Sequence, residues 1–227
     1  MRVLAIDTAL EACSAAVLDT ERAGVSAHES LPMLRGHAEA LIPLIARLLE
    51  RARLTFSEID RIAVTTGPGS FTGLRVGISA ARGIALAAGK PAVGLSTLAA
   101  FAAPFIAADD TQPVVVAVDA RHDHVYLQVF GPGGRTLVTP RLVPLREALR
   151  AAATGAPRLT GTAANMLAAA WPASERPPAA VEQRQAPDID WVARLGAAAV
   201  ETGSPPKPLY LRAPDAQPQD AAQLARR

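Results

Sequence analysis

A glycine-rich segment, GPGSFTGLRVG from Gly67 to Gly77, carries residue types that could bind an anion. It follows a short apolar run, RIAVTTG, and leads into a segment with helical spacing, so we expect it to join a strand to a helix. Free backbone N–H groups at a helix N-terminus favour a phosphate or another anion. The segment is therefore a candidate phosphate-binding loop.

The spacing of these glycines matches neither of two common nucleotide-binding motifs. A Walker loop needs lysine and then serine or threonine after its last glycine, whereas Gly73 is followed by leucine and arginine. A dinucleotide fingerprint needs G-x-G-x-x-G, and the spacing of Gly67, Gly69 and Gly73 has one residue too many. The alternative is structural, because glycines also supply turn conformations and a close strand-to-helix approach. Both interpretations stay open, although the bulky Phe71 favours packing or a protein contact.

Histidines are the other side chains that could hold a metal. His28 and His37 lie apart in the sequence, whereas His122 and His124 flank Asp123. Alternate residues of a strand face one side, so this pair could be written as a metal site. An exposed hairpin is the preferred interpretation because no third ligand can be named. We therefore expect no metal site.

The composition sets limits on the class of protein. Of the 227 residues 50% are hydrophobic, which predicts a globular chain, and no apolar run is long enough for a membrane span. The N-terminus makes a poor signal peptide, so a cytoplasmic location is expected. Cys13 lies in a strand-like run with nothing nearby to activate it, which indicates a buried structural thiol. The 23 basic and 21 acidic residues are too balanced to indicate a nucleic-acid surface.

The expected elements form an α/β pattern that is partly repeated. The first part reads strand, strand, strand, helix, strand, helix, strand, and a late helix begins from an Asp cap in DIDWVARLGAAAVETG. Between Ala151 and Pro187 we expect short helices and loops, and after Leu211 a disordered tail. The expected strands are VLAIDT, CSAAVLD, VSAHES, RIAVTTG, PAVGLS, VVVAVDA, VYLQVF and TLVTPRLV, and the expected helices are Gly36 onward, about Leu74 to Ala88, and TLAAFAAPFIAA.

Two of these helices carry more apolar surface than one core needs, which suggests an interface. Gly77 and Ala81 are small enough to let another helix come close, and Leu44 lies off the main stripe of its helix. The alternative, that all of these residues belong to the core, stays open. The candidate contact residues are His37, Leu41, Leu44, Leu48, Phe71, Leu74, Arg75, Gly77, Ile78, Ala81, Arg82 and Ala85.

Several long segments resemble one known family. They are MRVLAIDTALEACSAAVLD, RGHAEALIP, GPGSFTGLRVGISAARGIALA, GLSTLAAF, VDARHDHVYLQVF and the late PLYLR. They are similar to the TsaB (YeaZ) family, the non-catalytic partner in bacterial synthesis of tRNA threonylcarbamoyladenosine. The resemblance spans most of the chain and is strongest up to about Phe130.

The resemblance implies a fold. The family is similar to TsaD, which transfers the threonylcarbamoyl group, and both resemble the actin, sugar-kinase and Hsp70 superfamily. We therefore expect an α/β protein of two lobes, each a mixed sheet flanked by helices. Residues 1–96 would form the first lobe, with about 188–212 packing back on it, and residues 97–187 the second, before a disordered tail at 213–227.

The resemblance also implies what has been lost from the site. TsaD holds a metal through an HxxxH pair, and the corresponding positions here are Thr97 and Phe101, a hydroxyl and a phenyl that cannot share a metal as two imidazoles can. LTGTAAN is weakly similar to a GGVAAN stretch of the catalytic paralogue, with Thr162 in place of a glycine. The superfamily often keeps a carboxylate at the place of Asp7, although turn capping explains this residue equally well. The resulting candidate, a vestigial phosphate site, comprises Asp7, Thr8, Gly67, Gly69, Ser70 and Gly73.

The expected function is that of a non-catalytic scaffold or activator. The resemblance implies a heterodimer with TsaD, a TsaE-type ATPase in a ternary complex, and a homodimer when the chain is alone. The chain would support threonylcarbamoyl transfer to the adenosine next to the anticodon of ANN-decoding tRNAs, with tRNA held only through the complex. No cofactor is expected in the isolated chain, and a nucleotide only jointly with partners. The alternatives are a residual ATP-binding protein or ATPase, and a metal-dependent glycoprotease-like enzyme.

Overall fold

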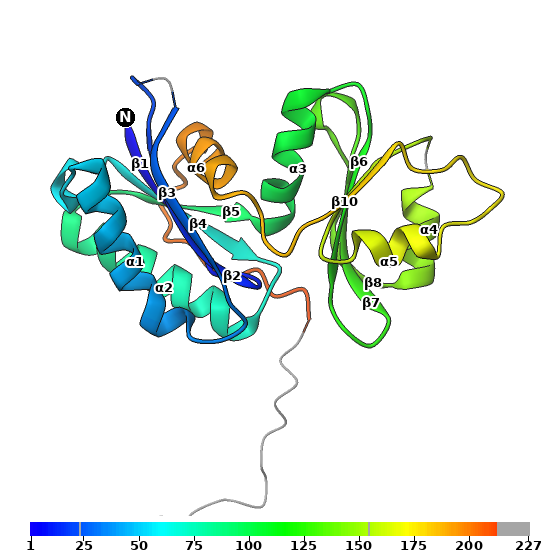
Figure 1. Cartoon of the computed structure of the whole chain (residues 1–227), viewed down its shortest axis with the longest axis horizontal. Helices are drawn as coiled ribbons and strands as arrows, with labels where there is room; N and C mark the ends of the chain where they lie inside the picture. The colour runs from blue at the N-terminus through cyan, green and yellow to red at the C-terminus, as the bar shows by residue number, and fades with distance from the viewer. Residues whose placement is uncertain (23, 154, 213–227) are drawn as a thin grey trace, which may run out of the picture.

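Two five-stranded sheets with the same strand order form the framework of the chain (Figure 1). The computed structural model describes residues 1–212 except positions 23 and 154, so the tail expected at 213–227 lies outside the described residues. Within the described part, no helix is both long and apolar enough to cross a membrane.

The first sheet has the order β3-β2-β1-β4-β5. Its first three strands form an antiparallel meander, and β4 and β5 continue the sheet in parallel from β1. Both faces of β1 are buried, because Leu4 and Ile6 belong to one core cluster and Val3 and Ala5 to another. The strands are β1 (Arg2–Asp7), β2 (Ala12–Asp19), β3 (Gly24–Pro32), β4 (Arg61–Gly67) and β5 (Ala92–Ser96).

The second sheet repeats this plan in the order β8-β7-β6-β9-β10. Again an antiparallel meander is followed by two strands parallel to its first strand. The strands are β6 (Val114–Asp119), β7 (His124–Phe130), β8 (Thr136–Pro144), β9 (Arg158–Gly161) and β10 (Ala180–Gln183). The short strands β9 and β10 lie in the alanine- and proline-rich stretch where only helices and loops were expected, so that expectation was incomplete.

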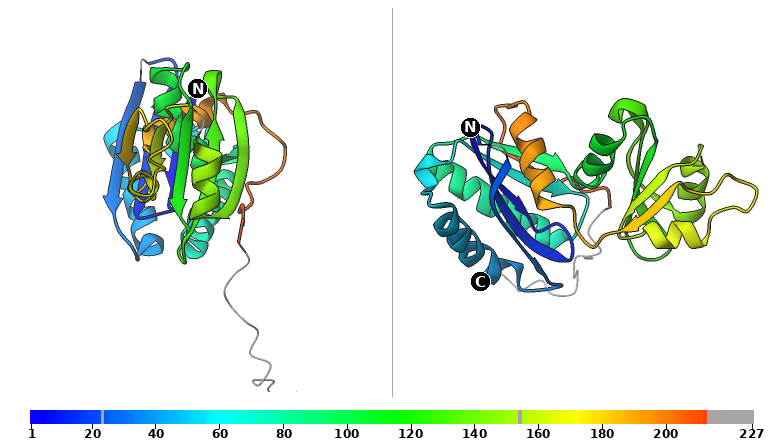
Figure 2. Two further views of the ribbon diagram at one scale, coloured as in Figure 1. Left: turned by 90° about the vertical axis from the view of Figure 1, so that its right-hand side faces the viewer. Right: turned by 45° about the horizontal axis from the view of Figure 1, so that its top comes forward.

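The helices complete a layered arrangement that Figures 1 and 2 show from three sides. One pair, α1 and α2, covers the outer face of the first sheet, α3 and α6 lie between the sheets, and α4 and α5 cover the outer face of the second sheet. The helices are α1 (His37–Ala52), α2 (Phe71–Ala88), α3 (Thr97–Ala108), α4 (Leu145–Ala152), α5 (Ala164–Ala169) and α6 (Ile189–Ala198), with short 3-10 turns at Phe56–Glu58 and Pro132–Gly134.

Local signals explain where the longer helices begin and end. The side chains of Ser70, Ser96 and Asp188 accept backbone N–H groups at the starts of α2, α3 and α6. Gly89 ends α2 in a left-handed conformation with φ 64°. The helix α1 contains Pro43 and continues through it to Ala52.

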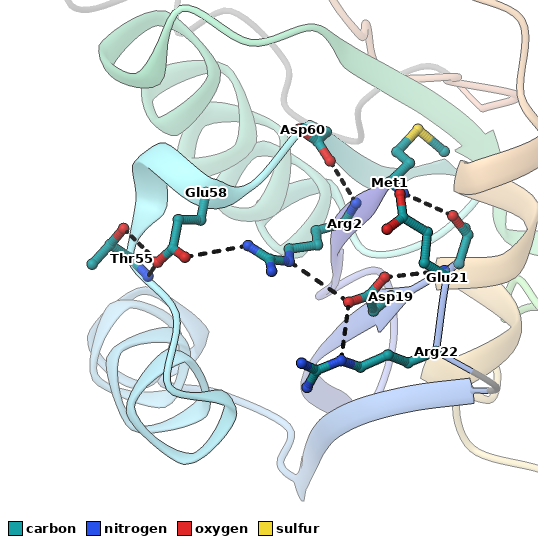
Figure 3. A network of polar contacts seen from close by, with 9 residues as sticks. Met1, Arg2, Asp19, Glu21, Arg22, Thr55, Glu58 and Asp60 are labelled. Carbon is teal, nitrogen blue, oxygen red and sulfur yellow. Dashed lines mark hydrogen bonds and ion pairs between the residues drawn. The ribbon is translucent and has the colours of Figure 1, made fainter.

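A polar network fixes the start of β1 to two neighbouring segments (Figure 3). The Arg2 guanidinium lies 3.2 Å from Glu58 and 3.7 Å from Asp19, and the Arg2 backbone N–H donates to Asp60 at 2.7 Å. A backbone N–H bond from Glu21, followed by the nearby charge of Arg2, holds the pKa of Asp19 below its usual value. The network holds the amino end of β1, and Asp7 lies at the opposite end of the same strand.

Candidate functional site

Asp7 lies fully buried at the carboxyl end of β1, where a sheet of this type commonly binds ligands. Its Oδ1 accepts hydrogen bonds from the Thr65 hydroxyl of the neighbouring β4 and from the Ala9 backbone N–H, while its Oδ2 has no hydrogen-bond partner among the described residues. Burial raises the pKa of Asp7 to about 6, although these two hydrogen bonds and the nearby His37 oppose the shift. Asp7 is thus the titratable centre of the predicted site.

The glycine-rich loop packs directly against the chain that leaves β1. A Cβ at Gly69 would lie 2.4 Å from the Ala9 carbonyl oxygen, and a Cβ at Gly73 would lie 2.1 Å from the Thr8 carbonyl oxygen. The Ser70 N–H donates to the Ala9 carbonyl at 2.7 Å, and the Thr8 hydroxyl donates to the Gly73 carbonyl at 2.7 Å. These glycines therefore permit a close backbone approach, as the structural interpretation of the loop required.

The structure brings the six residues predicted for a vestigial phosphate site together, but they are packed against one another. This close contact of the glycine-rich loop with the residues that follow β1 is called the joint below. Carbonyl oxygens of Thr8 and Ala9 fill the space that side chains at Gly69 and Gly73 would take. The N–H groups of Ser70, Gly73 and Leu74 donate within the chain, to the Ala9 carbonyl, the Ser70 hydroxyl and the Ser70 carbonyl respectively. An anion at this helix terminus would have to compete with those contacts.

The positions that correspond to the metal-binding pair of TsaD are both buried in the first turns of α3. Thr97 and Phe101 are 0% and 1% exposed, and the Thr97 hydroxyl has no hydrogen-bond partner among the described residues. Residues 1–212, leaving out positions 23 and 154, contain no group of three His, Cys, Asp or Glu side chains that could hold a metal ion. The donor set here therefore does not fit a metal.

The histidines serve local contacts instead. His28 Nδ1 lies 2.8 Å from Asp190 on α6, and His37 Nε2 lies 3.1 Å from the Leu10 carbonyl oxygen. His122 falls in the β6–β7 hairpin, whose residues 121–123 all have positive φ, and its carbonyl oxygen lies 2.6 Å from Nδ1 of His124.

Cys13 is buried, as expected, and burial raises the pKa of its thiol to about 11. A thiol with so high a pKa is a poor nucleophile at neutral pH.

The structure places most of the residues expected to contact a partner in the interior of the chain. Nine of them face the first core cluster or are otherwise buried in the single chain, as the alternative interpretation of these helices expected. Only Phe71, Arg75 and Arg82 of the predicted set are exposed. The spacing of apolar residues identified the apolar faces of α1 and α2, but these faces pack against the first sheet. The buried nine are His37, Leu41, Leu44, Leu48, Leu74, Gly77, Ile78, Ala81 and Ala85.

A C-terminal strap, residues 205–212, lies against the loop (orange to red in Figure 1); the sequence suggested that about 188–212 would pack back on the first lobe, but not that it would reach the loop. The Leu209 N–H donates to the Thr66 carbonyl at 2.7 Å, and the Leu209 carbonyl oxygen lies 2.9 Å from the Cβ position of Gly67. The Arg212 guanidinium donates to the Ala120 carbonyl of the second lobe at 2.9 Å. The strap thus joins the two lobes, and the PLYLR segment was its one signal in the sequence.

The second lobe has a matching joint at the end of β9. A Cβ at Gly161 would lie 2.2 Å from the Ala117 carbonyl of β6, which also accepts the Ala163 N–H at 3.0 Å. The Thr162 hydroxyl accepts the Asp119 N–H at 2.8 Å. Thr162 stands where the resemblance places a glycine in the paralogue. Its hydrogen bond with Asp119 stabilises this joint.

A cavity of about 720 Å³ lies elsewhere, between the C-terminal half of α2 and residues 201–205. Its lining includes Arg82, Leu86 and Lys90. It is at the opposite end of α2 from the glycine-rich loop, and so it takes no part in the Asp7 site.

Comparisons with known proteins agree with this geometry. The family model "TsaD: tRNA N6-adenosine threonylcarbamoyltransferase" matches residues 31–183. A "tRNA threonylcarbamoyladenosine biosynthesis protein TsaB" from Escherichia coli K12 is 40% identical over 56% of this chain and 53% of its own length. An uncharacterized protein of Mycobacterium tuberculosis H37Rv is 35% identical over 95% of this chain and 94% of its own length. A crystal structure described as "an uncharacterized protein with similarity to peptidase YEAZ from Pseudomonas aeruginosa" is 30% identical, covers 93% of this chain and 99% of its own, and has a TM-score of 0.78.

The repeated meander-plus-parallel sheets and the layers of helices define a two-lobed α/β protein in which each lobe is a mixed sheet flanked by helices. The alignments with the first curated relatives span only about half of their length. Since the TsaD model covers about two thirds of the chain and the related sequences and structures carry the TsaB and YeaZ names, the chain belongs to the TsaB (YeaZ) family of TsaD-like proteins.

Proposed function

We propose that this chain is a non-catalytic partner of a TsaD-type transferase in the biosynthesis of threonylcarbamoyladenosine in tRNA. The pathway comes from the names of its relatives, and the non-catalytic role from its own site. The modified nucleoside would be the adenosine next to the anticodon of ANN-decoding tRNAs. The chain would pair with TsaD, admit a TsaE-type ATPase as a third component, and form a homodimer when alone.

The observation that carries the proposal is the chemistry of the buried end of α3. Thr97 and Phe101 stand where the catalytic paralogue has two imidazoles, and a phenyl group cannot bind a metal. Asp7 has a carboxyl oxygen with no hydrogen-bond partner among the described residues, and no group of three His, Cys, Asp or Glu side chains in the described part of the chain could hold a metal there. The glycine-rich loop is already packed against β1. The fold thus keeps the framework of a catalytic site without its ligands.

The outer face of α1 and α2 supports the partner role. Ala38, Ile42 and Ala46 form a row at spacing i, i+4, i+8 on α1 and are exposed, with 52% of Ile42 accessible. On α2, Val76 and Ala80 are partly exposed. Small residues nearer the C-terminus of the helix are exposed as well and extend the same surface. Apolar residues left outside a complete core favour a protein interface. These residues replace the buried nine as the contacts of the proposed heterodimer.

The test is threonylcarbamoyl transfer to tRNA by the TsaD of the same organism, supplied with the activated intermediate and the ATPase component. We expect strong transfer only when this chain is added and none by this chain alone. Ile42→Asp should abolish both pairing and activation while leaving the circular dichroism spectrum unchanged. Glu39→Ala, on the same exposed side of α1, serves as the control. Transfer that does not depend on the chain, or tight nucleotide binding and hydrolysis by the chain alone, would contradict the proposal.

A further inference from the structure

Arg75 is an exposed cation at the start of α2 that the rest of the chain holds in one place. Its guanidinium carbon lies 3.7 Å from the ring centre of Phe71, one turn earlier on the same helix. Its Nε donates a hydrogen bond to the Tyr210 hydroxyl at 3.1 Å. The two rings also contact each other, with centroids 5.2 Å apart. Arg75 is therefore stacked on one side and hydrogen-bonded on another.

Two rigid parts of the fold build this arrangement. The packed joint between the glycine-rich loop and β1 fixes the start of α2, whose first two turns carry Phe71 and Arg75. The C-terminal strap brings Tyr210, because Leu209 bonds to Thr66 of β4 through its backbone. Residues far apart in the sequence thus meet around one guanidinium.

The terminal nitrogens of Arg75 remain available. Among the described residues no carboxylate lies within ion-pair distance of Arg75, whereas Arg47 and Arg51 of α1 both pair with Glu29. A guanidinium whose Nε is already used can still present its two terminal nitrogens, and their planar fork matches a carboxylate. Much of the entropy normally lost when an arginine is fixed has already been lost here.

We infer that Arg75 is a preformed receptor for an aspartate or glutamate side chain of the partner protein, with Phe71 and Tyr210 as its positioning residues. The inference rests on the proposed function and names a chemical feature of the partner at that surface. Arginine, tyrosine and phenylalanine are enriched at interfaces, and the first two dominate binding hot spots. Arg75 also borders the exposed face of α2 proposed above as the partner contact.

A protein carboxylate fits this surface better than an RNA phosphate does. An RNA surface gains affinity from many clustered cations. The helices α1 and α2 together carry four arginines, of which two are paired with Glu29, and the chain as a whole is nearly neutral. Phe71 and Tyr210 are only 38% and 43% exposed and already contact each other, so they present edges more than open faces for stacking bases.

The test is calorimetric binding of full-length variants to the TsaD of the same organism at low and moderate salt. We expect Arg75→Ala to weaken binding by about tenfold or more and to reduce its salt dependence. Arg75→Lys should lose most of the same affinity, because the charge remains without the planar fork. Tyr210→Phe, which keeps the ring and loses the hydrogen-bond acceptor, should cost about two- to threefold. Arg146→Ala is the matched control, an exposed arginine on α4 of the second lobe, outside the proposed contact surface, and should change affinity by less than about twofold.

Three outcomes would overturn the inference. If Arg75→Ala behaves like Arg146→Ala while the wild-type chain binds TsaD, the carboxylate receptor is wrong and the proposed partnership stands. If Arg75→Ala assembles normally but weakens tRNA binding by the complex, Arg75 contacts phosphate instead. If the wild-type chain forms no complex with TsaD, the proposed function and this inference both fail.

Discussion

The two lobes share one strand order but differ in the helices that cover their outer faces. On the first sheet α1 and α2 have 16 and 18 residues, whereas α4 and α5 on the second have 8 and 6. Both lobes have a similar joint: Gly69 and Gly73, just after β4, lie against carbonyls just after β1, and Gly161, at the end of β9, lies against a carbonyl within β6. The joint thus belongs to the fold itself, while the long helix pair with its exposed apolar rows is particular to the first lobe.

This difference distinguishes the joint, which stabilises both lobes, from the long helices of the first lobe, which carry the proposed partner surface. In both lobes the close approach at the joint is explained by packing alone. In the first lobe, however, the joint also sets the position of Phe71 and Arg75 at the start of α2. The contacts that hold the glycine-rich loop against β1 thus also fix the start of α2, where the proposed partner contact lies.

The largest expected effect tests whether the two joints are equivalent. Gly73→Ala and Gly161→Ala should each lower the free energy of unfolding by about 3 to 4 kcal/mol, because the new Cβ meets a backbone carbonyl that cannot move aside. Gly83→Ala is the control, since a Cβ at this exposed position of α2 has nothing within 4 Å and should stabilise slightly. Urea denaturation measures all three. Tolerance of either joint substitution would show that the two lobes are not built alike.

Arg61 tests how the first lobe holds its inner helix. Its Nη1 donates to the carbonyls of Gly196, Ala197 and Ala199 at the end of α6, and its Nη2 lies 2.7 Å from Glu201. We expect Arg61→Ala to cost about 2 to 3 kcal/mol in urea denaturation, since several carbonyls lose their donor. Glu201→Ala leaves those carbonyl bonds intact and should cost less than about 1 kcal/mol. Equal costs would mean that the ion pair, not the helix cap, matters.

Asp7 predicts a pH dependence of stability that belongs to the first lobe. Its pKa of about 6 in the folded chain lies above the usual carboxyl value, so the folded state binds the proton more tightly than the unfolded chain does. The stabilising contribution is full at acid pH below the unfolded pKa and is lost as the pH rises through about 6. Relative to Asp7→Asn, the wild-type chain should gain about 1.4 kcal/mol between pH 7.5 and pH 5. Asp119→Asn, at the equivalent strand end of the second lobe, should leave this gain in place because Asp7 is still present. A flat difference between wild type and Asp7→Asn would contradict the assignment.

The smallest expected effect comes from removing the threonine hydroxyl that forms a hydrogen bond at each joint. Thr8→Ala removes the donor to the buried Gly73 carbonyl and should cost about 1 to 1.5 kcal/mol. Thr162→Ala removes the acceptor for the Asp119 N–H, which can turn to water, and should cost about 0.5 to 1 kcal/mol. Thermal unfolding measures both. The reverse order would indicate that the second joint is the tighter one.

Much of the fold was predictable because its signals are local. Apolar runs in β1, β2, β4 and β6, and the Asp cap before α6, gave the elements and their order. The two short strands β9 and β10 were missed because strands of 4 residues in an alanine- and proline-rich stretch leave little periodicity.

The candidate site was less predictable because its contacts are between distant residues. The Gly67–Gly73 loop was identified, but only the structure places the Thr8 and Ala9 carbonyls against it. Periodicity likewise finds the apolar face of a helix without telling whether that face covers a sheet or a partner, and only the structure shows that Ile78 is buried in the core of the chain. The approach of Tyr210 to Arg75 joins residues 135 positions apart.

The most direct test of the central claim, that the first lobe alone carries the partner surface, is hydrogen exchange measured by mass spectrometry on this chain, free and with its TsaD. We predict slower exchange in the complex over α1, the first half of α2 and the strap around Tyr210, with no change over β8, α4 and α5. Protection over α4 and α5, or none over α1 and α2, would contradict the account.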